Sequence, residues 1–512
     1  MTIRALSAAF ILSTSIAAPA SGQIGPSPLS APDGSVMAAW TQITGNGSKQ
    51  GDLTGLVRVA LAGTGGQTAC DSYSLQVFGD ATAPIPALKA RQNDVPSKFP
   101  VTVCEAPVDP KWNTIALTTG GKKAPLWLPD GAAGPYVSFP TLHAVGRRNG
   151  GQIQMVTVGD TGCRDNSQQS CTSSATWPFG TLSDAAAAQT PDFVLHVGDY
   201  RYSHKGHSDS WKYWYEEFFY PARNLLLTSP WVMVRGNHEA CGYDNPTPVD
   251  APWGTGWFYF LQHHDAANSL SCPADSTEST PDPTAYQPPW YFDVGVIGGG
   301  TLRAPHRIIV MDSSTDTPSS KQVANFTTML GDTAATNSAW WTGHRPIWGI
   351  NPYSPVSALE ANLEQDLTAA LKSFSQGTPC WADSNLPCSL RTMIAGHIHN
   401  LERVLFFGTG SKSQSWIRPM QYVSGNSGVV LTPPMQASPC AFKVPQYSPS
   451  TFGPNLAATV DWQNAFGFTL WERDPLTQEL SGWKETRYLL DGGTVVPSSP
   501  PSITGTVTSP TC

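Results

Sequence analysis

Four short motifs in the sequence place carboxylate, amide and imidazole side chains directly after apolar runs. In chain order they are Gly159-Asp160-Thr161-Gly162, Gly198-Asp199-Tyr200-Arg201-Tyr202, Gly236-Asn237-His238-Glu239 and Gly396-His397-Ile398-His399. Oxygen and imidazole ligands of this kind hold hydrolytic pairs of metal ions, in which one carboxylate bridges ions about 3.5–4 Å apart. The motifs therefore predict a metal site, with Asp160 and Asp199 as its carboxylates.

The apolar runs before the motifs predict the strands that must position them. These runs are Ile153–Val158, 193–197, 231–234 and 393–395. Ligands in open α/β sheets collect at the carboxyl ends of strands, where residues far apart in the chain converge. A glycine directly before Asp160, Asp199, Asn237 and His397 indicates a tight backbone turn at each of these places. We therefore expect the four motifs to meet at one sheet edge.

Each motif taken alone has a simpler explanation. Asp and Gly after a strand are favoured in turns for backbone reasons. Asn237 could cap a helix, and His238 could satisfy its own backbone. His397 and His399 alternate with Ile398, so in an extended segment both rings point to one side and could serve two different ions. Four motifs in the same context of strand followed by ligand favour the metal site.

The order of the motifs resembles the calcineurin-like metallophosphoesterase superfamily from about residue 153 to 403. Tyr202, three residues after Asp199, is similar to the tyrosine that marks the purple acid phosphatase branch. The segment Thr342-Gly343-His344-Arg345-Pro346 looks like the one that supplies a further histidine. The alternative for His344 is a surface turn, because the residues before Trp340 and Trp341 are rich in Ser, Thr and Asn.

The resemblance implies a four-layer αββα sandwich with Fe(III) and a second divalent ion, zinc, iron or manganese. It implies that the iron is held by Asp160, Asp199, Tyr202 and His399. It implies that the second ion is held by Asp199, Asn237, His344 and His397. His238 is implied as the group that contacts the substrate phosphate or the leaving oxygen.

One departure from the family pattern concerns the acid that would assist the leaving group. Plant-type members carry additional histidines shortly after the position of His344, whereas residues 347–361 contain none. The possible substitutes are His204, His207, His263 and His264, although each is more often an ordinary exposed imidazole. His196 lies inside an expected strand and is interpreted as a core residue.

Composition and the amino terminus indicate an exported protein. The 512 residues carry a formal charge of −8, and only 13% of them are charged. The chain therefore lacks the excess of positive charge with which proteins bind long nucleic acid. In residues 1–22, Arg4 precedes an apolar stretch and Ala18-Pro19-Ala20, the anatomy of a secretory signal peptide. The alternative, a membrane anchor, needs about 20 apolar residues. We expect a secreted or periplasmic protein without a membrane span.

The cysteines agree with export. Ten cysteines without a Cys-x-x-Cys pair are more typical of disulfides than of metal ligands in an exported chain. Neighbours along the chain suggest the pairs Cys70–Cys104, Cys163–Cys171, Cys241–Cys272, Cys380–Cys388 and Cys440–Cys512. Bridges at the second, third and fourth of these pairs would lie close to the metal motifs and fix the loops around the pocket.

The chain divides into four predicted parts. After the signal peptide, residues 23–149 contain short strand-like pieces between turns, which predicts a β-sandwich-like accessory domain. Residues 150–490 form the expected catalytic domain, with helices at 182–188 and 211–227. A long insertion at 241–289 either forms a wall of the pocket or is a loop that only packs against the domain. Residues 491–512, rich in Pro, Ser and Thr, predict an irregular tail.

These observations predict an exported binuclear-metal phosphatase that hydrolyses phosphate monoesters of small molecules by attack of metal-bound hydroxide. A phosphodiesterase or nucleotide hydrolase on the same fold is an alternative, because fold and metal site do not fix the substrate. A more distant alternative is a non-catalytic surface or carbohydrate-binding protein whose metal motifs serve structure only. The oligomeric state stays open.

Overall fold

The computed structural model describes most of the chain between residues 30 and 498. The described ranges are 30–46, 53–79, 84–142, 153–164, 166–202, 209–242, 254–265, 270–273, 286–298, 301–348, 361–374, 386–408, 418–432, 442–443, 456–473 and 483–498. The predicted signal peptide lies outside these ranges, as do His204, His207, Cys380, Cys440 and Cys512.

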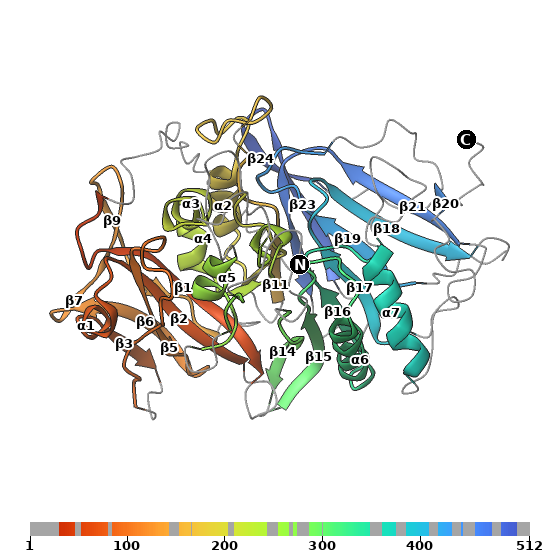
Figure 1. The fold of residues 1–512 in the computed structure, drawn as a ribbon, viewed down its shortest axis with the longest axis horizontal. Coiled ribbons are helices and arrows are strands. Elements are labelled where there is room, and N and C mark those ends of the chain that lie inside the picture. Colours follow the sequence, from red (N-terminus) through yellow and green to blue (C-terminus); the bar gives the residue numbers. More distant parts are fainter. Residues whose placement is uncertain are drawn as a thin grey trace, which may run out of the picture.

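Two large sheets form the centre of the molecule (Figure 1). The first sheet has 12 strands. Ten of them follow in the order β24 (Thr494–Ser498), β23 (Trp483–Asp491), β22 (Gly467–Arg473), β11 (Ile153–Val158), β12 (Phe193–His196), β13 (Trp231–Met233), β1 (Val36–Asn46), β2 (Leu53–Ala62), β5 (Val101–Pro107) and β4 (Lys89–Ala90). In addition, β8 (Pro125–Trp127) pairs with β1, and β9 (Ala133–Tyr136) pairs with β8. Strands β11, β12 and β13 are parallel to one another, and β22 runs antiparallel to β11.

The second sheet has 8 strands. Their order is β14 (Trp290–Gly298), β15 (Thr301–Val310), β16 (Ala339–Thr342), β17 (Leu390–Ala395), β19 (Met420–Ser424), β18 (Leu401–Gly408), β21 (Leu456–Gln463) and β20 (Phe442–Lys443). Strands β15, β16, β17 and β19 are parallel. A separate sheet of four strands contains β10 (Ser138–Phe139), β6 (Trp112–Thr119), β3 (Ser74–Gly79) and β7 (Lys122–Lys123).

Helices cover the outer faces of both large sheets. On the first sheet they are α2 (Phe179–Ala188), α3 (Trp211–Trp214), the π-helix η3 (Tyr215–Phe219), α4 (Arg223–Thr228) and α5 (Thr255–Phe260); on the second they are α6 (Ser320–Ala334) and α7 (Ala361–Ser373). The short α1 (Gly66–Asp71) and the 3-10 turn η4 (Asn237–Glu239) complete the set in the described ranges. None of these helices combines the length and apolar character that crossing a membrane requires.

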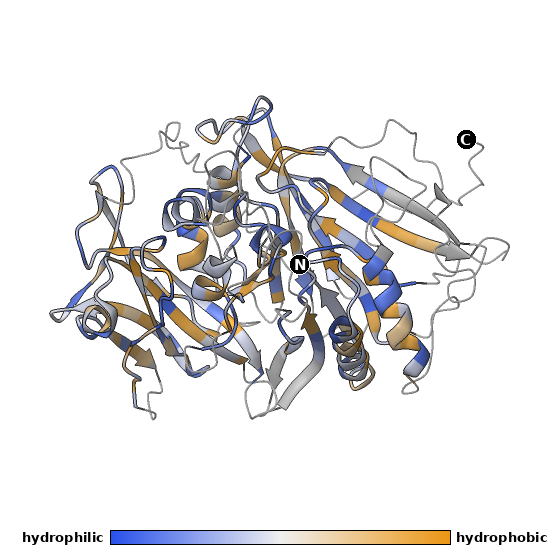
Figure 2. Cartoon of the chain, in the orientation of Figure 1, coloured by the Kyte–Doolittle hydropathy of each residue, from blue (hydrophilic) through white to orange (hydrophobic). Residues whose placement is uncertain are grey.

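Successive side chains of a strand point to opposite faces of its sheet, so each central strand contributes side chains to two different layers. Val156 and Val194 face the helices over the first sheet. Met155 and Leu195, their chain neighbours, belong to the core between the two sheets, which they share with Ile308 of β15. Figure 2 shows hydrophobic residues along these central strands and both hydrophobic and hydrophilic stretches on α7. The four-layer αββα architecture is therefore confirmed.

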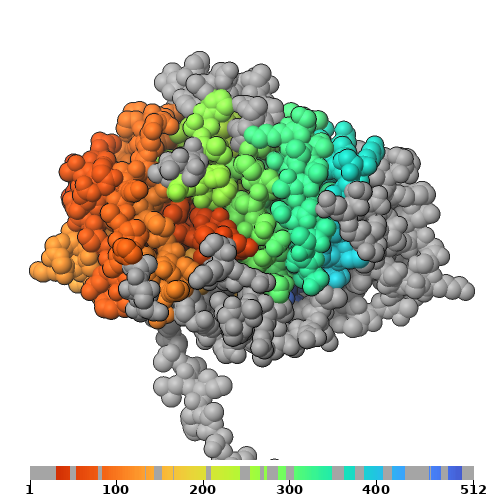
Figure 3. All heavy atoms as spheres, turned by 90° about the horizontal axis from the view of Figure 1, so that it is seen from below, coloured from red at the N-terminus to blue at the C-terminus, as the bar shows by residue number. Residues whose placement is uncertain are grey.

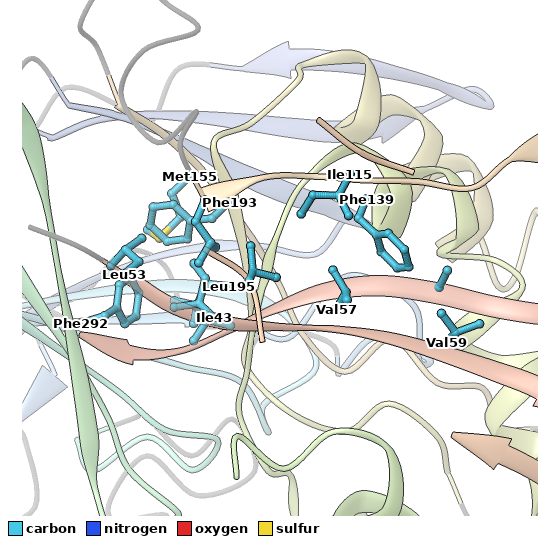
Figure 4. Close-up of a cluster of buried hydrophobic side chains, with 14 of the residues drawn as sticks. Ile43, Leu53, Val57, Val59, Ile115, Phe139, Met155, Phe193, Leu195 and Phe292 are labelled. Carbon is cyan, nitrogen blue, oxygen red and sulfur yellow. The ribbon is translucent and has the colours of Figure 1, made fainter. Parts of the chain in front are cut away.

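The N-terminal strands extend the first sheet. Strand β1 is parallel to β13 and pairs with it at Gln42 and Trp231. On the helix side Trp40 packs against Phe219, with 5.1 Å between ring centroids. On the other side Ile43 lies in the cluster that Figure 4 shows. In Figure 3 these red and orange segments lie directly beside the green ones. The domain division at residue 149 stays a prediction, since residues 143–152 lie outside the described ranges.

Two local expectations need correction. The predicted irregular tail begins with a strand, because Gly492 and Gly493 both take positive φ, 54° and 86°, and form a two-residue hairpin turn between β23 and β24. Pro497 is tolerated because β24 is an edge strand. The single helix expected at 211–227 is divided into α3, the π-helical turn η3 and α4.

Disulfides link α1 to β5 and tie together loops of the catalytic part of the chain. The predicted pairs Cys70–Cys104, Cys163–Cys171 and Cys241–Cys272 are confirmed. Cys388 is also in a disulfide. Its predicted partner and the pair Cys440–Cys512 lie outside the described residues.

Candidate metal centre

The predicted ligands converge at the facing edges of two sheets, not at the edge of one. Asp160, Asp199 and Asn237 follow β11, β12 and β13 of the first sheet. His344 follows β16 of the second sheet, and His397 and His399 follow β17. The carboxyl ends of parallel strands from both sheets therefore contribute to one site.

Three of these ligands have an unusual backbone conformation. Asp160, Asp199 and His397 have φ values of 55°, 57° and 72°. A left-handed backbone costs a non-glycine residue energy and is found mostly where function requires it. The turn at each strand end thus points the ligand side chain toward the other sheet.

The glycines before the ligands allow the loops to approach closely. A Cβ at Gly236 would lie 2.2 Å from Asp199 Oδ1, and one at Gly396 would lie 2.4 Å from Asp160 Oδ2. Such distances leave no room for a side chain. The sequence predicted tight turns at these glycines, whereas the structure shows that they are required mainly because another ligand occupies the space.

The first group of ligand atoms contains Asp160, Asp199 and His399, whose ligand atoms all lie within 4.8 Å of one another. The Tyr202 hydroxyl lies between two of them, 3.0 Å from Asp160 Oδ1 and 3.2 Å from His399 Nε2. Two carboxylates, an imidazole and a phenol therefore meet at one point. This donor set fits a hard, highly charged cation.

The second group contains Asp199, His344 and His397, again within 4.8 Å. Asn237 Oδ1 lies 2.8 Å from His344 Nε2 and 2.8 Å from His397 Nδ1. His344 Nε2 also lies 3.3 Å from Asp199 Oδ2. Oxygen and imidazole ligands of this kind suit zinc, iron or manganese. Asp199 belongs to both groups, which is the arrangement of a bridging carboxylate.

Backbone carbonyls orient two of the imidazoles. His344 Nδ1 lies 2.8 Å from the carbonyl oxygen of Val197, and His399 Nδ1 lies 3.2 Å from that of Val430. A ring that donates its Nδ1 proton to a carbonyl presents the lone pair of Nε2 to a metal ion. Both Nε2 atoms face the other ligands of their groups. His344 is fully buried, so the surface-turn alternative for it is wrong.

Buried charges in the site favour a cation. Without one, burial and the neighbouring Asp199 raise the pKa of Asp160 to about 8. Burial acts on Asp199 in the same direction, but His344 and His238 outweigh it and hold the pKa of Asp199 well below its usual range. Burial, Asp160 and Asp199 raise the pKa of Tyr202 well above its usual value. A bound cation would stabilise all three in their charged forms.

Two buried glutamates hold the ligand loops together by accepting backbone N–H groups. Glu239 accepts from Asp199 and Gly236 through Oε2, both at 3.1 Å. Glu217 accepts from Cys163 at 3.0 Å and from Tyr202 at 2.9 Å. Glu217 lies on the π-helical turn η3, and such turns are frequent at functional sites. The sequence contains no spacing signal that identifies Glu217.

A further loop, residues 425–432 after β19, was not identified from the sequence. The backbone N–H groups of Ser427 and Val429 donate to Gly159 and Asp160, at 3.2 and 2.8 Å. A Cβ at Gly428 would lie 2.2 Å from the carbonyl oxygen of Thr161. This loop therefore supports the first ligand loop. Its signal in the sequence is the pair Gly425 and Gly428 after an apolar strand.

His238 lies beside the ligands. Its backbone N–H donates to Asp199 Oδ1 at 3.0 Å, and its ring packs at 4.3 Å from the ring of Tyr202. Burial is the main cause that lowers the pKa of His238 well below its usual value, and Arg164 lowers it further. The imidazole is therefore neutral at physiological pH.

His196, His263 and His264 lie outside the two ligand groups. The His263 ring stacks on Trp290, with 4.9 Å between ring centroids, and makes a tilted contact with His264 at 4.0 Å. Burial lowers the pKa of His263 to about 3. His196 is fully buried, 2.8 Å from Thr161 Oγ1, and stacks on Tyr200, as expected of a core residue. The structure places neither His263 nor His264 among the metal groups of the described residues.

One family model and several solved structures are similar to this chain. Residues 156–401 match the family model of the calcineurin-like phosphoesterases. Among solved structures, the purple acid phosphatase PPD1 from yellow lupin (Lupinus luteus) seeds has a TM-score of 0.54 at 13% identity, over 92% of this chain and 74% of that one. The structure of PhoD has a TM-score of 0.45 at 11% identity, over 92% and 90%.

A search of curated proteins finds no match. At such low identity the lupin structure supports the fold alone, and the similarity to the family rests on the matched sequence segment. That segment begins within β11 and ends after His399, so it contains all the candidate ligands. Residues 156–401 are therefore similar to the calcineurin-like phosphoesterases, and this match, together with the two groups of candidate ligands, supports a metal-dependent phosphoesterase.

Proposed function

We propose that this protein is an exported phosphatase that hydrolyses phosphate monoesters at a pair of metal ions. The observation that carries the proposal is the position of Asp199, whose carboxylate belongs to both groups of ligand atoms. When bound, two ions at such a centre polarise the phosphoryl oxygens and activate water for in-line attack.

In this proposal Asp160, Asp199, Tyr202 and His399 hold Fe(III), and Asp199, Asn237, His344 and His397 hold a divalent ion. The Tyr202 hydroxyl supports the choice of iron, because a phenol whose pKa is raised by burial and two carboxylates needs a strong Lewis acid to ionise. His238 contacts the substrate and not a metal ion. Its neutral ring beside Asp199 is suited to receive a proton near the phosphate.

Export is supported by the disulfides, since such bridges persist in oxidising compartments. The amino-terminal residues that would direct it resemble a signal peptide. Mass spectrometry of protein recovered from the medium or periplasm should find an amino terminus near residue 21 or 23. A retained residue 1 in the exported protein would contradict the proposal.

Rates on a phosphate monoester, a diester and a nucleotide test the activity. We expect the highest kcat/KM on the monoester, loss of turnover after chelation, and recovery when iron and a divalent ion are restored. A preference for the diester or the nucleotide would favour the alternative on the same fold. Retained turnover in the fully chelated protein would exclude metal-dependent hydrolysis.

A further inference from the structure

Two arginines that the metal site does not require lie against it from two sides. Arg164 Nη2 is 3.3 Å from His238 Nε2, and its guanidinium carbon is 4.8 Å from the centre of the Tyr202 ring. Arg345 Nη1 is 3.1 Å from His397 Nε2. Tyr202 lies at the first ligand group and His397 belongs to the second. One guanidinium therefore flanks each group.

The two arginines lie on the same loops as candidate ligands of the two groups. Both arginines follow a candidate ligand closely in the chain, four residues after Asp160 and directly after His344. Their positions are thus set by the same strand ends as the ligands.

The bond between Arg345 and His397 depends on where the imidazole carries its proton. In the second group His397 Nδ1 faces Asn237 Oδ1 and the other ligands. An imidazole that gives Nδ1 to a metal ion carries its proton on Nε2, where it cannot accept a hydrogen bond. With the ion bound, the Arg345 donor must therefore turn from His397 to another acceptor. A substrate anion at the ions would be such an acceptor.

The number of oxygens on the substrate decides what these arginines can recognise. A phosphate monoester has three terminal oxygens, and a diester has two. If each of two ions takes one terminal oxygen, the monoester retains a third for a hydrogen-bond donor and the diester retains none. Arginine is well suited to this task, because its planar guanidinium donates in a fork and keeps its charge.

We propose that Arg164 and Arg345 together bind the third terminal oxygen of a phosphate monoester and thereby select monoesters over diesters. The proposal rests on the proposed function, which supplies the two ions. It assigns to the arginines the role of substrate-binding residues that determine specificity.

The test uses Arg164→Met and Arg345→Met, which remove the guanidinium and keep an unbranched side chain. Arg223→Met is a matched control, because the Arg223 guanidinium also lies over a tyrosine, 4.4 Å from the centre of the Tyr220 ring, but on α4. Three quantities are measured on metal-loaded protein: the Kd of inorganic phosphate by calorimetry, kcat/KM for p-nitrophenyl phosphate and for bis(p-nitrophenyl) phosphate, and metal content.

We expect each Met variant to weaken phosphate binding and monoester kcat/KM by roughly 10- to 100-fold, the effect of losing a charged hydrogen bond. Diester kcat/KM and metal content should match the wild type, and Arg223→Met should change nothing. Arg345→Lys should recover part of the loss, because it restores the charge without the fork.

An unchanged phosphate Kd in both Met variants would overturn the proposal. So would an equal loss on monoester and diester, or loss of a metal ion, which would make the arginine a support of the ligands. Failure of the proposed function is distinguished by the wild type. A wild-type protein that prefers diesters would contradict the proposed function. Weaker phosphate binding in the Met variants would then still identify the arginines as phosphate ligands.

Discussion

The hydroxyl of Tyr202 lies 3.0 Å from the carboxylate of Asp160. The two residues come from loops after neighbouring parallel strands, β11 and β12. Burial and the two carboxylates keep the tyrosine protonated in the absence of a cation. The same hydroxyl that donates to Asp160 would become the phenolate ligand of Fe(III).

Tyr202→Phe should therefore remove the visible absorption of the iron-loaded protein. A phenolate bound to Fe(III) gives a charge-transfer band, and the Phe ring keeps the packing without the oxygen. Absorption spectra of both proteins measure this. Tyr200→Phe is the control, because Tyr200 is equally buried but its hydroxyl donates to the Val234 carbonyl at 3.0 Å. Colour that persists in Tyr202→Phe would remove Tyr202 from the ligands.

His238→Ala should lower turnover by roughly 10²–10⁴-fold, as expected for a positioned proton-transfer group. Metal content should stay unchanged, because the His238 side chain is in neither ligand group. Steady-state kinetics with elemental analysis separate the two effects. His264→Ala is the control, because His264 belongs to neither ligand group, and it should retain full turnover. Stoichiometric loss of one ion in His238→Ala would instead identify a ligand.

Glu217 should act as a positioning residue for Tyr202. Glu217→Leu leaves the N–H groups of Cys163 and Tyr202 without their acceptor, at a cost of about 1–3 kcal/mol each. We expect lower stability and a shifted or weaker iron band. Glu217→Gln retains an acceptor oxygen and should recover the band. A Leu variant that is destabilised but has the wild-type spectrum would limit Glu217 to a structural role.

A buried ion triad should make stability depend on acid pH. Glu105 Oε2 lies 2.9 Å from Arg58 Nε and 2.6 Å from Arg91 Nη1. Burial raises the pKa of Glu105, but the two arginines outweigh it and the pKa falls below its usual value. The stabilisation is therefore present above the pKa of an unfolded glutamate, about 4.3, and is lost as pH falls through the lower folded pKa.

Glu105→Gln should destabilise the protein by about 3–5 kcal/mol near neutral pH, because it leaves two buried guanidinium groups without their counter-charge. It should also weaken the dependence on acid pH. Denaturant unfolding at several pH values measures both. Lys484→Gln is the control, since Lys484 is 75% exposed and its pair with Glu472 contributes about 0–1 kcal/mol. An effect of equal size in both variants would contradict the prediction.

Local patterns in the sequence predicted much of the site. An apolar run followed by Gly-Asp or Gly-His predicts a strand end, and strand ends are where Asp160, Asp199 and His397 lie. The division of these strands between two sheets was missed, because pairing depends on contacts between distant segments. The extension of the first sheet by β1 was missed for the same reason, since β1 meets β13 across almost 190 residues.

Other features have no local signal. The π-helical turn that carries Glu217 interrupts a helical pattern of aromatics, and that pattern predicted one continuous helix. Arg164 and Arg345 resemble any loop arginines until the fold brings them to the imidazoles of His238 and His397. The hairpin at Gly492 and Gly493 did have a signal, but the Pro- and Ser-rich residues after it favoured an irregular tail.

The most direct test of the central claim is the metal content of Asp199→Asn compared with the wild type. A carboxylate that belongs to both ligand groups should serve two cations, so its neutralisation should weaken both sites at once. Elemental analysis should find about two ions per chain in the wild type, iron among them, and a loss of both in the variant. A variant that retains both ions with near-normal turnover would contradict the bridging role of Asp199 and the binuclear centre built on it.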